Sequence, residues 1–274
     1  MNPLLFLRRI WAFIVRDWRL QLSYRMQFFI RALSILIMVT TLFFISKIFA
    51  GYTDPRFAQW SNPLAAWLTG LAVLSYFMTG FSSLANAIRQ EQVQGTLESV
   101  LMTPISVPTV IVASSAWDFV QATFFSSLYL LFGWLFFDVH YQGNYLLALA
   151  FLLLTTVVLS CLGILSASFA MVFKRGDPFG IFLGAGSALF SGVFFPTQLI
   201  SEYAGGLKYI SWILPATHGL DGIRRVLIQG QGFAEVREPL ITLLAFLAVL
   251  LPLSLWVFGR AVRRAKREGS LIQY

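Results

Sequence analysis

Charge is scarce in this sequence, and so are the residues that build metal and disulfide sites. Only 12% of the 274 residues are charged, and the chain has one cysteine and two histidines. Cys161 has no partner for a disulfide within the chain, and neither His140 nor His218 belongs to an HExxH motif or a cysteine cluster. No Ser/His/Asp or paired-carboxylate arrangement stands out. We therefore expect no metal site and no catalytic residue, and do not expect an enzyme.

Two further motifs are missing. No GxxxxGK[ST] loop occurs in the sequence, so we expect no such triphosphate site in this chain. Residues 1–26 carry too many charges for the apolar core of a cleavable signal peptide. The arginines that interrupt this stretch are Arg8, Arg9, Arg16, Arg19 and Arg25.

Apolar residues are abundant, at 58% of the chain, with a mean hydropathy of +0.75. A soluble domain of this size cannot bury so much apolar surface, so the bilayer is the implied solvent. Because one membrane span needs about 20 apolar residues, we predict an all-α integral membrane protein that forms a single transmembrane domain over residues 1–274. The six predicted spans are 27–48, 64–87, 116–137, 145–172, 179–198 and 239–259.

The basic residues behind the net charge of +8 cluster beside these spans. Anionic headgroups and the positive-inside rule explain such clusters, so we expect no nucleic-acid partner. With the N-terminus in the cytoplasm, most Lys and Arg residues fall on the cytoplasmic side, and both termini face it. The residues on that side are Arg8, Arg9, Arg16, Arg19, Arg25, Arg89, Lys174, Arg175, Arg260, Arg263, Arg264, Lys266 and Arg267.

Residues 3–22 form one apolar stripe at helical spacing, with arginines over the rest of the surface. This pattern predicts a helix that lies in the membrane interface. A helix that packs on another part of the protein is the alternative. The stripe consists of Leu4, Leu7, Trp11, Val15, Trp18 and Leu22.

The segment 89–106 is polar and lies between two long apolar runs. Val93, Leu97 and Leu101 recur at helical spacing, and Glu91 and Glu98 fall on other faces. We expect a short amphipathic helix at the cytoplasmic surface, which would contact a soluble partner or the lipid headgroups.

The segment 196–238 is too apolar for an ordinary external loop, and Gly205, Gly206 and Pro215 divide it into short pieces. We expect short broken helices that dip back into the membrane, as external re-entrant helices between the fifth and sixth spans. An amphipathic lid that lies flat on the surface is the alternative. Thr217 is the expected N-cap of a last helix over 218–228.

Three motifs occur in a recognisable order. Glu91 precedes Gly95-Thr96-Leu97-Glu98 and Thr103-Pro104-Ile105-Ser106; Gly192 precedes Phe195-Pro196; and Leu214-Pro215-Ala216-Thr217 precedes Gly222-Ile223-Arg224. With the six spans and the N-terminal helix, the chain resembles the ABC-2-type permeases, which are membrane subunits of ATP-binding-cassette exporters. The resemblance covers nearly the whole chain.

The resemblance implies a bacterial inner-membrane protein, an ATPase partner that binds ATP and Mg²⁺ on its own subunit, and no cofactor in this chain. It implies a second permease copy, as a homodimer or heterodimer. The segment after the second span would be the coupling helix, with its contacts at Glu91, Gly95, Thr96, Leu97, Glu98, Leu101 and Pro104. The dimer interface would include Gly180, Gly184 and Ser187, and packing within one subunit is the alternative.

The substrate is less well defined by the sequence. The apolar spans favour a drug or lipid as the exported molecule, and polysaccharide or glycolipid export is the alternative. Aromatic residues could line a path, for which the candidates are Phe125, Tyr129, Phe195 and Pro196; lipid contact or an interface belt is the other interpretation. Two other function classes are a membrane-embedded lipid-modifying enzyme and a non-transporting scaffold subunit of an ABC complex.

Overall fold

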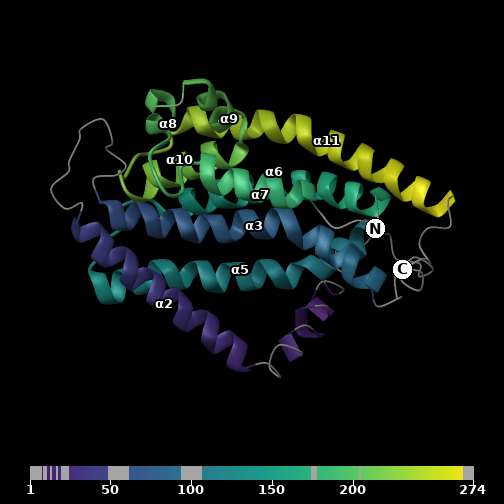
Figure 1. The fold of residues 1–274 in the computed structure, drawn as a ribbon, viewed down its shortest axis with the longest axis horizontal. Helices are drawn as coiled ribbons and strands as arrows, with labels where there is room; N and C mark the ends of the chain where they lie inside the picture. The colour runs from purple at the N-terminus through teal and green to yellow at the C-terminus, as the bar shows by residue number, and fades with distance from the viewer. Residues whose placement is uncertain are drawn as a thin grey trace.

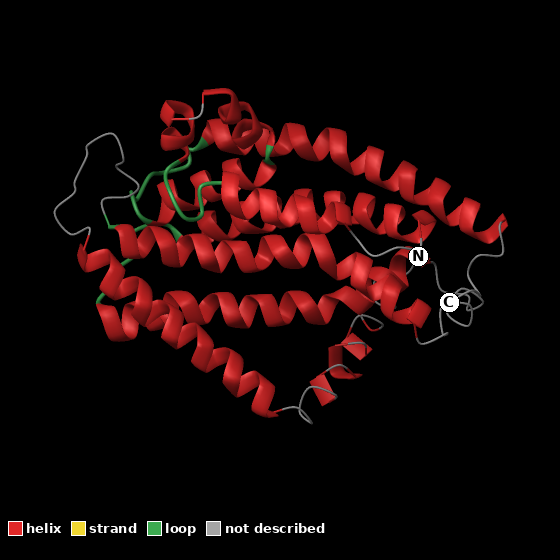
Figure 2. Ribbon diagram, in the orientation of Figure 1, coloured by secondary structure: helices red, strands yellow, loops and turns green. Residues whose placement is uncertain are grey.

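The computed structural model describes residues 8, 11–12, 14–16, 18–19, 25–48, 62–93, 107–173, 178–203 and 205–267. All regular elements in these residues are helices (Figure 2). Five of them are long and apolar enough to cross a membrane, which confirms the all-α membrane class. They are α2 (Arg25–Ile48), α3 (Pro63–Val93), α5 (Val107–Phe137), α6 (Tyr145–Phe173) and α11 (Arg237–Arg267).

The region of the fifth predicted span differs from the prediction. Helix α7 (Pro178–Phe190) has 13 residues, which at about 1.5 Å per residue is about 20 Å of helix. A continuous helix over 179–198 is therefore wrong. The backbone turns at Gly192, which has a φ of 86°, and Pro196 has no N–H to continue a helix.

Helix α3 lies at the centre of the bundle (Figure 1). It packs against α2, α5, α6, α7 and α10 (Pro215–Leu227), and 67% of its apolar window is buried within the chain. The contact with α6 is close because two glycines meet there. A Cβ on Gly163 would overlap the carbonyl oxygen of Gly80, so small residues allow the two backbones to approach.

Asparagine side chains begin two of the long helices. Asn62 Oδ1 accepts the backbone N–H of Ala65 at 3.1 Å, and Pro63 takes the first helical position, where no N–H is required. Asn144 Oδ1 accepts the N–H groups of Leu146 and Leu147 at 3.0 and 3.2 Å. These caps explain why the predicted starts at 64 and 145 agree with α3 and α6.

Helix α3 is longer at its other end than the predicted span over 64–87. It continues without a break to Val93, so the first residues of the 89–106 segment extend α3. The stretch from Ala85 to Gln92 contains no glycine or proline, and the first glycine after it is Gly95. Residues with high helix propensity therefore extend α3 beyond the apolar run.

The region after α7 consists of short helices, as predicted: α8 (Thr197–Tyr203), η2 (Gly205–Leu207), α9 (Lys208–Ile213) and α10. They gather at the end of the bundle where α11 begins (Figure 1). The expected cap at Thr217 is wrong. Helix α10 starts at Pro215, and its N-cap is Leu214, because a proline is favourable in the first helical turn.

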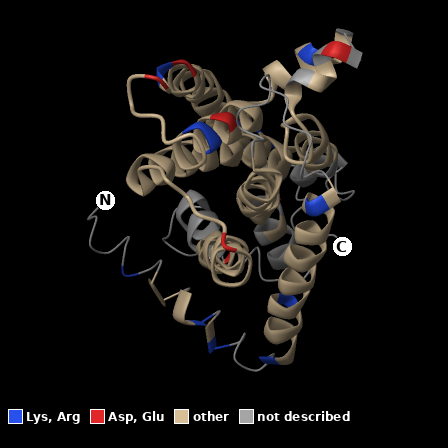
Figure 3. Cartoon of the chain, turned by 90° about the vertical axis from the view of Figure 1, so that its left-hand side faces the viewer, with Lys and Arg blue, Asp and Glu red and all other residues tan. Residues whose placement is uncertain are grey.

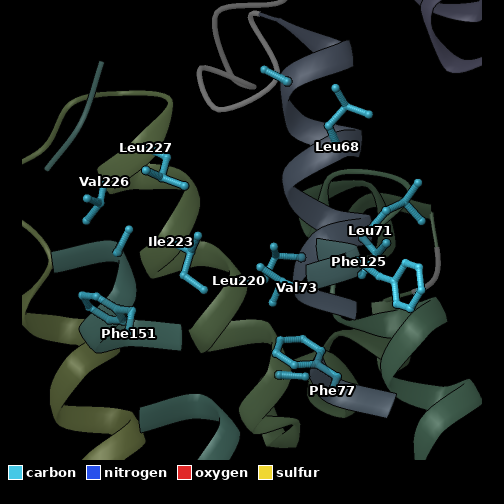
Figure 4. Packing of buried hydrophobic residues seen from close by; sticks show 14 of the residues in the cluster. Leu68, Leu71, Val73, Phe77, Phe125, Phe151, Leu220, Ile223, Val226 and Leu227 are labelled. Carbon is cyan, nitrogen blue, oxygen red and sulfur yellow. The ribbon is translucent and has the colours of Figure 1, made fainter. Parts of the chain in front are cut away.

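Helix α10 is enclosed by protein, whereas α9 exposes Tyr209 and Trp212. Figure 4 shows Leu220 and Ile223 of α10 between Phe151 of α6 and Val73 of α3. Irregular backbone at membrane depth is tolerated where protein surrounds it. The packing of α10 meets that condition, and its depth in a membrane stays a prediction.

The described residues between 8 and 19 are helical. The ring of Trp18 lies edge-on to that of Trp117 on α5, with centroids 5.7 Å apart, while Trp11 is exposed. This segment therefore contacts the bundle through Trp18. Such a contact is expected if the helix packs on another part of the protein, which is the alternative interpretation. Its predicted position in the membrane interface remains a prediction.

Candidate functional site

The candidate site is the bend at residues 191–196, which follows α7. Ser191, Gly192 and Val193 are buried there. The left-handed φ of Gly192 favours glycine, and a Cβ at this position would come within 2.9 Å of the Thr197 Cγ2 atom. A bend of this kind leaves buried carbonyl groups without helical partners, so they need other donors.

One arginine supplies most of these donors. Arg224 on α10 is 3% exposed. Its Nη1 donates to Gly192 O at 2.6 Å, and its Nη2 donates to Val193 O at 3.1 Å and to Ala66 O at 2.8 Å. The planar guanidinium fork suits several fixed acceptors at once. Arg224 thus joins α10, the bend and the first turns of α3.

Trp67 completes the arrangement from α3. Its Nε1–H donates to Phe194 O at 2.8 Å. Three consecutive carbonyls of the bend, at residues 192, 193 and 194, therefore accept from two side chains. Space is restricted here, because a Cβ on Gly70 would come within 2.8 Å of Arg224 Nη2 and 2.9 Å of Val193 O.

The electrostatics fit a charged guanidinium held by carbonyl dipoles. Burial lowers the pKa of Arg224 to about 9, and the Asp221 carboxylate opposes this shift, so the side chain carries its charge at neutral pH. Arg225 turns outward and pairs with Asp221, with Nε and Oδ2 2.9 Å apart. Figure 3 faces this end of the molecule and shows how few charged residues the helices carry.

Sequence reasoning found Arg224 only as part of the Gly222-Ile223-Arg224 motif and missed its contacts with carbonyl groups. A signal was present, because Arg224 follows Leu220 by one helical turn and lies between Ile223 and Leu227 on the same face. A cation on an apolar helix face indicates a buried partner.

The predicted coupling residues fall at or beyond the end of α3. Glu91 belongs to the last turn of the helix, and its side chain is outside the described part of the structure. The remaining six lie outside the described residues: Gly95, Thr96, Leu97, Glu98, Leu101 and Pro104. Their role stays a prediction.

The predicted dimer residues lie on α7. Gly180, Gly184 and Ser187 are all buried within the single chain. A Cβ on Gly184 would lie 3.2 Å from the Met78 Sδ atom, so this residue faces α3. Such burial within one chain is expected from the alternative interpretation, in which these residues pack within one subunit. The dimer interface at these residues stays an untested prediction.

The predicted path residues do not gather in one place. Phe125 is buried in the core, where the guanidinium of Arg31 lies 4.0 Å from its ring centroid. Tyr129 packs against the same core, while Phe195 and Pro196 belong to the bend. A path lined by all four residues therefore has no geometric support within the chain and remains a prediction.

Within the described residues, no three His, Cys, Asp or Glu side chains come together as metal ligands. In comparisons with known proteins, residues 8–228 match the family model described as ABC-2 type transporter. Among curated proteins, no sequence matches the chain.

Proposed function

The chain belongs to the ABC-2 type transporter family, and we propose that this permease exports a hydrophobic or amphipathic molecule, a drug or a lipid, out of the cytoplasm. The observation that carries the proposal is the family match over residues 8–228, together with five apolar helices long enough to span a membrane, of which α3 is the central one. The low charge and high apolar content of the spans favour an apolar cargo over a polysaccharide or glycolipid, which stays the alternative.

The family implies an ABC ATPase as partner. We place its contact at the last turn of α3 and the segment that follows it, with Glu91 and Glu98 facing basic residues of the ATPase. ATP and Mg²⁺ would then bind to that partner. The absence of a GxxxxGK[ST] loop from this sequence supports ATP binding by a separate subunit.

Helix α3 provides a connection between the two ends of the molecule. It runs 31 residues from Pro63 to Val93, or about 46 Å at 1.5 Å per residue. One end leads into the proposed ATPase contact. The other end carries Ala66 and Trp67, which bond to Arg224 and to the bend. Movement of the ATPase would therefore act on the bend through a single rigid element.

We also propose that two copies pair, and that the protein resides in a bacterial inner membrane with both termini in the cytoplasm. The excess of Lys and Arg on that side supports the orientation. As α3 moves against the bend, a path between the two copies would open alternately to the two sides of the membrane.

A pull-down from mild-detergent membranes, with mass spectrometry of the bound proteins, tests this function. We expect a stoichiometric ATPase with the wild type and its loss with Glu98→Lys. Glu238→Lys, a charge reversal at the exposed start of α11, is the matched control and should retain the ATPase. The proposal fails if no ATPase accompanies the wild type, and the coupling assignment fails if Glu98→Lys retains it.

A further inference from the structure

Arg31 is a cation within α2, one of the five helices that are apolar enough to cross a membrane. Helix α2 runs obliquely beside α5 (Figure 1). The guanidinium carbon lies 4.0 Å from the centroid of the Phe125 ring on α5. The apolar part of α5 runs from Ser115 to Phe137, so Phe125 is about 15 and 18 Å from its two ends at 1.5 Å per residue. The charge of Arg31 therefore lies near the middle of this apolar segment.

A charge at such a depth calls for a counter-ion. Cations in membrane spans are costly, and they pair with an anion or extend toward the headgroups. Arg31 instead lies against α5. In the part of the chain that the structure describes, no carboxylate forms an ion pair with this residue. Because the side chain is exposed, an anion from outside the chain can reach it.

Aromatic rings form the protein side of this site. Phe28 precedes Arg31 by one turn of α2, and its ring centroid lies 5.1 Å from that of Phe125 and 4.9 Å from that of Phe124. Tyr129 follows Phe125 by one turn of α5, and the charge of Arg31 acts on its hydroxyl. We call these five residues the α2–α5 seam. Phe124 is 44% exposed, so the seam opens toward the surroundings of the bundle.

The seam has hydrogen-bond donors to spare. The Phe125 ring accepts no conventional hydrogen bond, so the N–H groups of Arg31 stay available. The hydroxyl of Tyr129 is half-buried and makes no hydrogen bond to any described residue. A guanidinium can hold a carboxylate or phosphate through two parallel N–H bonds. A hydroxyl one turn away adds a further donor, and the rings offer hydrocarbon beside it.

The seam is distinct from the other surfaces discussed above. Helix α7, which carries the predicted dimer residues, packs on α3 and α6, whereas the seam is formed by α2 and α5. The bend and Arg224 contact the first turns of α3. The exposure of Arg31 is therefore not explained by either of these contacts.

We propose that the α2–α5 seam binds the anionic group of an amphiphile, and that this amphiphile is the exported molecule. Its carboxylate or phosphate pairs with Arg31 and accepts from Tyr129, while its hydrocarbon lies along Phe28 and Phe124. A resident phospholipid keeps its phosphate at the headgroups, outside the hydrocarbon layer. A cation near the middle of a span therefore suits a cargo in transit. This inference rests on the proposed export function and narrows the cargo to an anionic amphiphile.

Photo-cross-linking of the full chain in phosphatidylcholine vesicles tests the site. The probe is a long-chain fatty acid that carries a diazirine, at a pH that keeps the acid ionised, and its methyl ester is the uncharged control. Arg31→Gln removes the charge. Lys47→Gln is the matched variant, since Lys47 is a cation of the same helix that lies over a ring, 5.0 Å from the Phe43 centroid, but in the last turn.

We expect the acid to label α2 and α5 and the ester to label them far less. Arg31→Gln should reduce labelling by the acid roughly ten-fold, because a charge-assisted pair is lost. Tyr129→Phe should reduce it roughly three-fold, while Arg31→Lys and Lys47→Gln should retain most of it. Equal labelling of the wild type by acid and ester would overturn the proposal. So would equal labelling of wild type and Arg31→Gln by the acid.

A second arm separates a cargo from a resident lipid. The same labelling is repeated in vesicles that contain phosphatidylglycerol as an anionic competitor. Labelling that persists supports a cargo site. Labelling that phosphatidylglycerol abolishes would assign the seam to a bilayer lipid and overturn the cargo assignment.

A third arm uses the complex isolated with its ATPase. The acid should stimulate ATP hydrolysis with the wild type and Lys47→Gln, and fail to do so with Arg31→Gln. Equal stimulation of all three would overturn the cargo assignment. Because the labelling needs no ATPase, the two proposals fail separately: the absence of an ATPase contradicts the export function, and the labelling still decides the site.

Discussion

The guanidinium of Arg224 and the carbonyl of Gly192 are joined by a hydrogen bond of 2.6 Å. This bond ties α10 to the bend that ends α7. Val193 and Ala66 accept from the same guanidinium, so α10 cannot leave its place without exposing three carbonyls and one buried charge.

Arg224→Lys should lower the free energy of unfolding by about 2–4 kcal/mol, because an ammonium cannot reach all three acceptors. Thermal unfolding of the purified protein in lipid discs measures the loss. Arg225→Lys is the control, since its ion pair with Asp221 is partly exposed and its loss should cost less than about 1 kcal/mol. Equal losses in both variants would refute the special role of Arg224.

Trp67→Phe should cost about 0.5–1.5 kcal/mol, because the ring remains while the hydrogen bond to Phe194 O is removed. Since Trp67 and Arg224 hold adjacent carbonyls of one bend, their effects should not add. A double-mutant cycle with Arg224→Lys measures this coupling, expected at about 0.5–3 kcal/mol. Simple additivity would mean that the bend is not a shared unit.

Gly222→Ala and Gly186→Ala should change stability in opposite directions. A Cβ on Gly222 would overlap the Phe151 ring of α6, so we expect a loss of about 1–3 kcal/mol. A Cβ on Gly186 would meet nothing within 4 Å, and alanine in a helix should add about 0.5–1 kcal/mol. Thermal unfolding of the two variants side by side decides this, and a loss in both would contradict the packing described for α7.

Long apolar runs could be predicted well from the sequence, while contacts between distant residues could not. The predicted 145–172 agrees with α6 to within one residue at its C-terminal end, because Asn144 caps the start of an unbroken apolar stretch. In contrast, the acceptors of Arg224 lie 32 and 158 residues away in the chain. No spacing rule connects positions so far apart.

The glycines of α7 illustrate the same limit. Gly180 and Gly184 were expected at a contact between helices, either in the dimer or within one subunit, and both are buried within the chain. The sequence could not reveal which helix covers Gly184, which in the structure is α3 at Met78. Nor could the apolar composition of 179–198 show that the helix ends early, since that end depends on the left-handed Gly192.

The outward face of α7 leads to a prediction about pairing. Phe182 is 76% exposed, whereas Gly184 faces α3. If two copies meet along α7, Phe182→Ala should reduce the cross-linked dimer in membranes by several-fold, because a buried aromatic anchor contributes about 2 kcal/mol or more. Leu135→Ala on the exposed face of α5 is the control. Unchanged dimers in Phe182→Ala would place the interface elsewhere.

The length of α7 has a consequence for the surrounding bilayer. Its roughly 20 Å of helix is about 10 Å less than the thickness of a typical hydrocarbon layer. If α7 crosses the membrane as predicted, the lipids beside it would thin or the bend would lie below the headgroups, at a cost that grows with each ångström of mismatch. Lipids with shorter acyl chains would relieve this mismatch. Membrane thickness would thereby act on the position of the bend in the bilayer, through a force that no side chain of the protein supplies.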